Sequence, residues 1–341
     1  MKVLYIGLKT FGHGYFQYLT LKKIYKKVDF IDNFKAFFLP KITNAIFWQI
    51  SPIILEPFLN RYVLSRIKKS YDLIYITSGE LIGKKLILEL KKKTKKIAFY
   101  CEDNPFVSRD KKRWKLFLPA SQFYDLIIFQ QKSRINLSKK YGIKKTLLTF
   151  PTYQKNIHRP QKISPNEKKK YASNVLFIGT WYPERGIFFK KLIDLGLDLK
   201  IYGIQWKKDP NYESMKSRIK LGHIHEPLYS KMIQCTKIAL CIPSKGNLDG
   251  ITRRSTEIPA IGTLLCATRT KEHQNVFVEN KEAIFFKSAN ECYKKCEYLL
   301  NNTKKIKKIS YRGHIKVTKI LKLENLLLIK KIITKLLGKN N

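Results

Sequence analysis

One segment of the sequence, residues 244–268, combines carboxylates and cations at a spacing that suits a polar ligand. Asp249 and Glu257 are separated by seven residues, and Arg253 and Arg254 lie between them. Carboxylates beside a helix N-terminus can accept hydrogen bonds from sugar hydroxyls, while neighbouring guanidinium groups bind phosphate. The same spacing fits a helix-capping Asp and a surface Glu paired with Arg equally well, so the residues alone leave both interpretations open.

A second candidate begins at residue 174, where the sequence reads NVLFIGTWYPERGIFF. The apolar run predicts a strand that ends at Gly179, followed by a short loop and a helix that starts near Arg185 and Gly186. A guanidinium group beside the free N–H groups of a helix N-terminus suits a diphosphate. An arginine at a helix start can also be a surface cap, so this pattern by itself is a modest signal.

The elements that must position these residues follow from alternating apolar and lysine-rich segments. Runs rich in Ile, Val, Phe and Tyr predict buried parallel strands, and the segments between them predict helices. The expected strands are 2–6, 73–77, 96–100, 126–130 and 146–150, then 174–178, 199–203, 238–242 and 263–267. The expected helices of the second half are 186–195, 227–235, 254–261 and 289–300. The predicted fold class is α/β, with two Rossmann-like βαβ domains facing each other across a cleft.

The domain boundaries follow from one polar segment in mid-chain. Residues 159–170, RPQKISPNEKKK, carry two prolines and a lysine run, a composition typical of an interdomain linker. We therefore expect a linker at 161–172 between two domains. The expected parts are an N-terminal domain at 1–160, a C-terminal domain at 173–313 and a basic amphipathic helix at 314–341.

The C-terminal helix has two interpretations. Ile329, Ile332, Ile333 and Leu336 recur at helical spacing, and lysines occupy the other side. Such a helix either packs back on the body of the protein, which we favour, or lies on an anionic membrane surface.

Composition limits the class of protein. The 341 residues carry 68 Lys+Arg against 25 Asp+Glu, a formal net charge of +43, while 44% hydrophobic residues exclude a disordered basic tail. The N-terminus lacks the apolar core of a signal peptide, and the apolar region 45–59 is interrupted by polar residues and too short to span a membrane. The six cysteines form no CxxC and are expected to be reduced thiols. These features predict a cytoplasmic protein.

Several common motifs are absent. Residues 7–14, GLKTFGHG, have the glycine spacing of a P-loop, but His13 and Gly14 stand where that motif needs Lys and Ser or Thr. No GxGxxG or HExxH occurs, and His223 and His225 have no evident third ligand, so no metal site is expected.

At this point a family resemblance becomes specific. FIGTWYPERG (177–186), IYGIQW (201–206), TRRSTEIPAIGTLLCAT (252–268) and the segment 275–300 together resemble the CgeB-like glycosyltransferases, a group with the two-domain GT-B fold. The resemblance covers residues 172–313 closely. It extends more weakly into the N-terminal half through 100–105, 124–145 and 150–160.

The resemblance implies transfer of a sugar from a nucleotide-sugar donor, such as a UDP- or GDP-sugar, without a metal or other cofactor. In the wider glycogen-synthase-like group a Glu-x7-Glu pair contacts the donor sugar and ribose; Glu257 matches the second Glu, and Asp249 replaces the first with a reach shorter by one methylene. Arg185 matches a diphosphate-binding position, with Arg254 or Lys245 supplying the charge that Thr180 lacks. The expected donor-binding residues are Arg185, Gly179, Thr180, Tyr182, Lys245, Arg254, Thr252, Gly12 and Gly14.

The stereochemistry of transfer decides whether an enzymic base is needed. A retaining reaction, which we favour, needs none if the departing phosphate takes the acceptor proton, whereas an inverting one needs a carboxylate or His near the acceptor. The candidates for that base are His13 and Asp103, which join Asp249 and Glu257 as expected catalytic residues.

Two other functions are compatible with parts of the sequence. The chain could be a catalytically silent GT-B relative, or a basic protein that binds polyanions or a membrane surface through its lysines. A glycan, a lipid-linked sugar or a protein is the expected acceptor, and peripheral contact with an anionic membrane is an open alternative. No signature with interleaved aromatics supports binding to nucleic acid.

Overall fold

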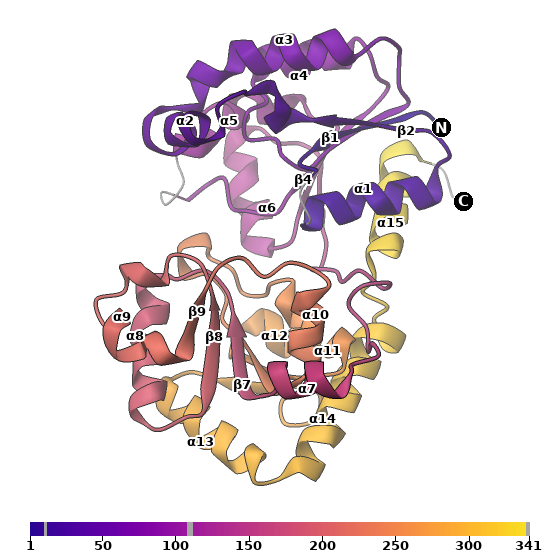
Figure 1. The fold of residues 1–341 in the computed structure, drawn as a ribbon. Helices are drawn as coiled ribbons and strands as arrows, with labels where there is room; N and C mark the ends of the chain where they lie inside the picture. The colour runs from indigo at the N-terminus through magenta and orange to yellow at the C-terminus, as the bar shows by residue number, and fades with distance from the viewer. Residues whose placement is uncertain (10–11, 108–111, 339–341) are drawn as a thin grey trace. The chain divides into compact units, whose positions relative to one another are not determined.

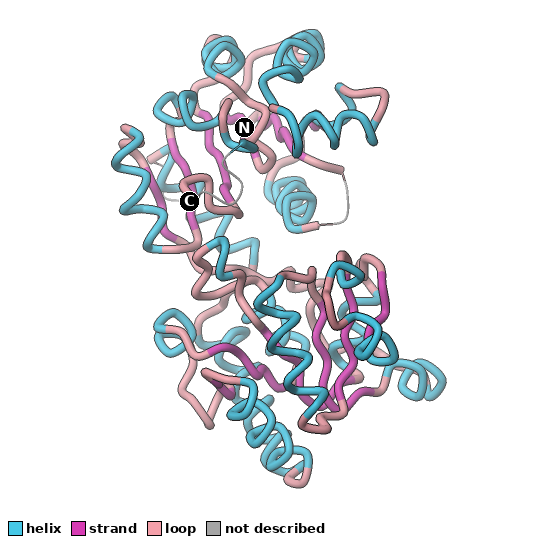
Figure 2. The backbone as a smooth tube through the Cα atoms, turned by 90° about the vertical axis from the view of Figure 1, so that its left-hand side faces the viewer, coloured by secondary structure: helices cyan, strands magenta, loops and turns pink. Residues whose placement is uncertain are grey.

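Two six-stranded parallel sheets organise the chain in the computed structural model, which describes residues 1–9, 12–107 and 112–338 (Figure 1). The first compact unit comprises residues 1–150, 245–248 and 325–341, and the second comprises 151–244 and 249–324. In each unit, helices cover both faces of one sheet (Figure 2). The expected α/β class is confirmed.

The sheet of the first unit has the order β2-β1-β3-β4-β5-β6. Its strands are β1 (Val3–Gly7), β2 (Val28–Asp32), β3 (Leu73–Ile76), β4 (Ile97–Cys101), β5 (Leu126–Phe129) and β6 (Thr146–Leu148). Its helices are α1 (His13–Ile24), α2 (Pro40–Ala45), α3 (Glu56–Arg66), α4 (Lys84–Lys91), α5 (Phe117–Ala120), α6 (Lys132–Ser138) and α15 (Asn325–Leu337). The strand order reverses between β1 and β3, so the loops that follow these two strands diverge there and leave space for a ligand.

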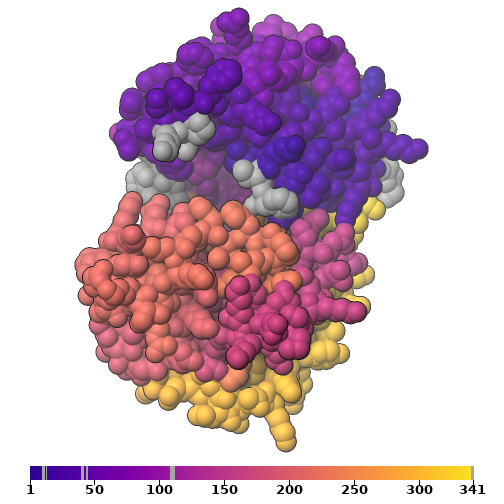
Figure 3. Space-filling view, viewed as in Figure 1, coloured from indigo at the N-terminus to yellow at the C-terminus, as the bar shows by residue number. Residues whose placement is uncertain are grey.

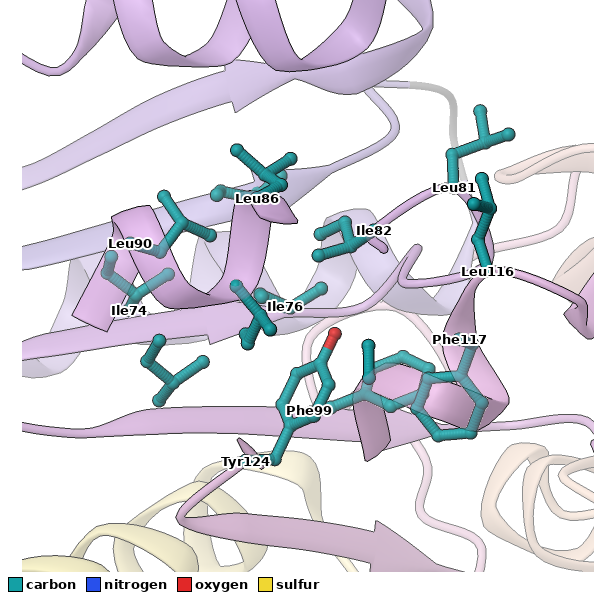
Figure 4. Close-up of a cluster of buried hydrophobic side chains, with 14 of the residues drawn as sticks. Ile74, Ile76, Leu81, Ile82, Leu86, Leu90, Phe99, Leu116, Phe117 and Tyr124 are labelled. Atoms are coloured by element: carbon teal, nitrogen blue, oxygen red, sulfur yellow. The ribbon is translucent and has the colours of Figure 1, made fainter. Parts of the chain in front are cut away.

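Alternate side chains of these central strands enter two different cores. Ile74, Ile76 and Phe99 point to the face covered by α3, α4 and α5, as Figure 4 shows. Tyr75 and Tyr100 point to the opposite face, which α1 and α15 cover. Because both faces are buried, these strands read as continuous apolar runs, which is why the sequence predicted them.

The second unit repeats the plan with the order β12-β11-β10-β7-β8-β9. Its strands are β7 (Ser173–Ile178), β8 (Leu199–Gly203), β9 (Ile219–Leu221), β10 (Thr236–Cys241), β11 (Leu264–Thr268) and β12 (Ile284–Phe286). Its helices are α7 (Pro165–Tyr171), α8 (Pro183–Asp194), α9 (Tyr212–Met215), α10 (Leu228–Gln234), α11 (Arg254–Ile261), α12 (Lys271–Val276), α13 (Ala289–Leu300) and α14 (Thr303–Ile315). The helices α13 and α14 contribute the yellow part of its surface in Figure 3. The strand order reverses between β7 and β10.

The structure adds three strands that the sequence analysis did not predict, namely β2, β9 and β12. Each lies at the edge of a sheet, has only one neighbouring strand, and spans three to five residues. Strands β2 and β9 are partly exposed, so they lack the long apolar run of a central strand.

Two expected segments also differ from the structure. The linker expected at 161–172 contains helix α7, which a Ser164–Glu167 capping box begins, and belongs to the second unit. The single helix expected at 314–341 is divided: α14 continues into a π-helical turn at 316–320 within the second unit, and α15 belongs to the first.

Helix α15 packs back on the protein, as we favoured. Ile329, Ile332, Ile333 and Leu336 are buried against the sheet face that α1 also covers. Among the described residues no helix is both long and apolar enough to cross a membrane.

We predict that Ile332→Ala lowers the free energy of unfolding of the first unit by about 2–5 kcal/mol, because Ile332 is fully buried between α15 and the sheet. Chemical denaturation measures the change. Leu327→Ala, on the exposed side of the same helix, is the matched control and should cost about 0.5 kcal/mol or less. Equal effects of the two variants would contradict a core role for α15.

Candidate functional site

Arg185 lies where the strand order of the second sheet reverses, between β7 and β10. Its side chain is only 4% exposed. One guanidinium nitrogen, Nη1, donates to the carbonyl oxygen of Thr180 at 2.8 Å, and Nη2 donates to the carbonyl oxygen of Ile242. Arg185 therefore ties the loop after β7 to the loop after β10, at the usual ligand-binding position of such a sheet.

The surroundings of Gly186 hold the start of α8 in place. The buried Asp209 carboxylate accepts a hydrogen bond from the indole nitrogen of Trp181 at 2.7 Å. A Cβ at Gly186 would come within 1.7 Å of the same carboxylate, so no other residue fits there without displacing Asp209. The guanidinium of Arg185 also packs over the ring of Tyr182, 4.7 Å from its centroid.

Arg254, the first residue of α11, places a second positive charge near Arg185. Burial and the charge of Arg254 lower the pKa of Arg185 to about 10. The buried Nε atoms of both arginines lack a hydrogen-bond partner, and neither side chain has a carboxylate within 4.0 Å among the described residues. Arg185 is buried and Arg254 is half-buried, and a bound anion would neutralise two such cations that have no described carboxylate within ion-pair distance.

Glu257 lies one turn into α11 and is buried. The Tyr229 hydroxyl donates to its Oε2 at 3.0 Å. Burial opposes ionisation of Glu257, but His158, Arg253 and Arg254, together with the Tyr229 hydroxyl, hold the pKa of its carboxyl below the ordinary value. Glu257 is therefore an ionised acceptor near a cationic site.

His158 and Glu226 complete this cluster, and the sequence analysis did not find them. The backbone N–H of Gln154 donates to Nδ1 of His158 at 3.0 Å, and Nε2 of the ring lies 3.0 Å from Glu226 and 3.9 Å from Glu257. The two carboxylates thus flank one imidazole. These residues are far apart in sequence and in no recognisable motif, so only the fold reveals the cluster.

The other residues predicted in this unit lie in the loops around the same strand ends. Gly179 follows β7, and its carbonyl oxygen accepts from the indole nitrogen of Trp206 at 3.0 Å. Thr252 donates through its backbone N–H to Ser255 at 3.2 Å, just before α11. Asp249 is partly exposed, and its backbone N–H donates to the carbonyl oxygen of Ser244 at 3.1 Å.

Lys245 and Asp103 both belong to the first unit. Lys245 is exposed in the short segment 245–248. Asp103 accepts from Arg113 at 2.6 Å and from the Asn247 side chain at 3.1 Å. Burial opposes ionisation of Asp103, but Arg113 holds the pKa of this carboxyl below its ordinary value. Asp103 is therefore a weak base, and its catalytic role stays a prediction.

The glycine loop after β1 lies at the reversal of the first sheet. Gly12 precedes α1, and a Cβ at Gly14 would come within 2.8 Å of the Thr77 hydroxyl, which follows β3. The glycine at 14 thus allows α1 to approach β3 closely. The side chain of His13 lies outside the described residues, so its predicted role is not tested.

Three cysteines form the group of described side chains with metal-binding geometry. The sulfur atoms of Cys266 on β11 and of Cys292 and Cys296 on α13 lie within 4.8 Å of one another, and all three residues are buried. They pack in the apolar core between the sheet and α13. The sequence predicted reduced thiols, and their apolar surroundings are those of core cysteines.

A buried histidine fixes the start of α11. Nδ1 of His273 donates to the carbonyl oxygen of Thr268 at 2.8 Å, and Nε2 lies 2.8 Å from the Ser255 hydroxyl. Burial lowers the pKa of His273 to about 4. Because Ser255 directly follows Arg254, His273 is a positioning residue for the cationic site.

Several solved structures share this arrangement of two parallel sheets. A sucrose-phosphate synthase from Thermosynechococcus elongatus superimposes with a TM-score of 0.72, at 11% identity, covering 99% of this chain and 100% of that one. The fold is GT-B. HepE from Anabaena in complex with UDP-glucose gives 0.66 at 12% identity, with 99% and 100% coverage. An E. coli trehalose-6-phosphate protein bound with UDP-2-fluoro glucose gives 0.65 at 12% identity, with 98% and 99% coverage.

The second half of the chain also matches a protein family in sequence. Residues 185–323 match the family described as glycosyl transferase-like, which is fewer than half of the residues. The match begins at Arg185 and includes Arg254 and Glu257. No curated protein matches the chain in sequence.

We predict that acidification lowers the free energy of unfolding because His273 is buried in its neutral form. Its pKa is lower in the folded protein than in the unfolded chain, so the unfolded chain binds a proton first, and stability is lost as pH falls from about 6.5 to about 4. The loss should approach about 3 kcal/mol. Denaturation at several pH values should show a shallower dependence for His273→Gln, whereas parallel curves would contradict the assignment.

Proposed function

We propose that the protein is a glycosyltransferase that takes a sugar from a nucleoside diphosphate sugar. The observation that carries this proposal is the pair of cations at the reversal of the second sheet, the buried Arg185 and the half-buried Arg254. Among the described residues, neither has a carboxylate within ion-pair distance. The match of residues 185–323 to a glycosyl transferase-like family supports it. The UDP-glucose complex of HepE, which has the same fold, suggests a UDP-sugar as the donor.

The arginines act on the leaving group. When the bond from the sugar to the diphosphate breaks, negative charge develops on the departing oxygen, and fixed cations stabilise it. Arg185 is held by two backbone carbonyls and needs little reorganisation. Arg254 adds charge from the N-terminus of α11, where backbone N–H groups also favour an anion.

Glu257 accepts hydrogen bonds from the ribose hydroxyls of the donor. An ionised carboxylate accepts hydrogen bonds only, which matches a pair of hydroxyl donors. The contacts of Tyr229 and His158 orient the carboxylate, while Glu226 orients His158 in turn. Asp249 contacts the donor sugar from the loop before α11, with the shorter reach of an aspartate.

We propose a retaining transfer in which the departing diphosphate takes the acceptor proton. The low pKa of Asp103 makes this residue a weak base and therefore supports a reaction without an enzymic base in this position. The acceptor is a glycan, a lipid-linked sugar or a protein. Membership of the CgeB-like group and a cytoplasmic location also belong to this proposal.

We predict that UDP or GDP raises the melting temperature by about 5 °C or more at a hundred-fold excess over its Kd, because a ligand that binds only the folded state stabilises it. Arg254→Met should abolish the rise, since the diphosphate loses a cation. Differential scanning fluorimetry measures both.

Arg218→Met is the matched control. Arg218 belongs to the same unit but forms an exposed ion pair with Asp198, so its loss should leave the ligand-induced rise unchanged. If neither nucleoside diphosphate shifts the melting temperature at millimolar concentration, the proposed donor site is wrong.

We predict slow hydrolysis of one nucleotide sugar in the absence of acceptor, and at least a ten-fold loss of kcat/KM in Glu257→Gln. The amide keeps the shape of the side chain but loses the charge that accepts two hydroxyl donors. A panel of UDP- and GDP-sugars, analysed by release of the nucleoside diphosphate, gives the measurement. Binding of the donor without release from any sugar would favour a catalytically silent relative.

A further inference from the structure

The first unit exposes eight large apolar side chains between residues 38 and 58. Phe38 is 95% exposed, Phe58 62% and Trp48 52%. We call this surface the apolar patch. Its members are Phe38, Leu39, Ile42, Trp48, Ile50, Ile53, Ile54 and Phe58.

The patch is the outer face of a two-faced segment. Phe47, Pro52, Leu55 and Leu59 from the same segment are buried, and all but the proline belong to the core beneath α3 and α4. The segment is therefore folded against the unit, and the exposed side chains point away from its core. Figure 1 shows α2 and α3, which begin and end the segment.

The exposed apolar area is as large as the largest patch of a typical monomer, which is often functional. Large aromatic side chains bury on the order of 150–250 Å² each when they become covered. Eight large side chains exposed by about half or more therefore present several hundred square ångströms, which usually marks an interaction surface.

The charges around the patch are almost all positive. Between residues 33 and 69 the chain has six Lys or Arg and a single acidic residue, Glu56. Lys35 and Arg61 are exposed beside the patch residues in sequence. In the fold, the ammonium group of Lys112 donates to the backbone carbonyl of Gln49 at 3.3 Å. The guanidinium of Arg113 lies 5.4 Å from the Trp48 ring centroid, but Glu80 and Asp103 neutralise its charge, so the exposed lysines and Arg61 supply the positive rim.

We propose that the apolar patch docks the protein on an anionic lipid membrane. Phe38, Trp48 and Phe58 enter the interface between headgroups and acyl chains, while the surrounding lysines and arginines contact the lipid phosphates. This inference goes beyond the proposed transferase activity and does not depend on it. It places the membrane contact on the first unit and not on the C-terminal helix, whose apolar face is buried.

Charge favours a membrane over a second copy of the chain. Two copies that paired through this patch would bring two positive rims together in a protein of net charge +43. An anionic bilayer instead offers negative charge around an apolar interior, so it complements both the rim and the patch.

The test is flotation of the full chain with vesicles of phosphatidylcholine alone or with about one third phosphatidylglycerol. We expect binding to the anionic vesicles that weakens with salt, and at least a ten-fold loss in the triple variant Phe38→Ser, Trp48→Gln, Phe58→Gln. Tyr311→Gln, an exposed aromatic on α14 of the second unit, is the matched control and should bind as the wild type does.

Insertion has its own readout in Trp48. Lipids brominated along the acyl chains should quench part of the tryptophan fluorescence of the wild type, and Trp48→Phe should remove that quenching while binding persists. Of the other tryptophans, Trp114 and Trp206 are buried, so their emission should change little.

Three results would each overturn the proposal that the apolar patch binds a membrane. Absence of binding to anionic vesicles at low salt, or equal binding by the triple variant, would overturn the proposal. A wild-type dimer that the triple variant converts to a monomer would assign the patch to self-association and also overturn it. Far-UV circular dichroism and a cooperative thermal transition report whether the triple variant is folded; if it is not, Phe58→Gln alone with Lys35→Glu replaces it.

Discussion

The burial of the Arg185 guanidinium close to a second cation, Arg254, is the constraint around which the candidate site of the second unit is arranged. Neither group has a carboxylate partner among the described residues, and burial with mutual repulsion lowers the pKa of Arg185. A protein designed for stability alone would neutralise such charges. Their position at the reversal of the sheet is the reason for our proposal that an anionic ligand neutralises them, because binding sites often sacrifice stability for function.

Buried polar contacts keep the two cations in this arrangement. Asp209, Trp181 and Gly186 fix the start of α8, while Ser255 and His273 fix the start of α11. These contacts connect loops that follow different strands, so each strand end is oriented by its neighbours. These residues hold Arg185 and Arg254 in place before any ligand binds.

Two amphipathic segments of the first unit, α15 and the segment 38–58, differ in whether their apolar side chains are covered. The most regular apolar stripe, on α15, closes the core of the first unit, whereas the irregular segment 38–58 leaves its outer face uncovered. A regular stripe fits a flat sheet face, and short helical turns joined by prolines present side chains on both sides. Membrane contact, which the sequence analysis left open for the C-terminal helix, is therefore proposed for the segment 38–58 instead.

The sequence by itself determined the fold class, all nine expected strands to within two residues, and the helix 254–261. Central parallel strands are apolar on both faces and need no distant partner to be recognised. It also singled out Arg185, Arg254 and Glu257 through local motifs. Only the tertiary structure decided the roles of His158, Glu226 and Tyr229, the edge strands β2, β9 and β12, and the division of the C-terminal helices between the units. Each of these depends on contacts between residues that are remote in sequence, and the local pattern of apolar residues does not reveal such contacts.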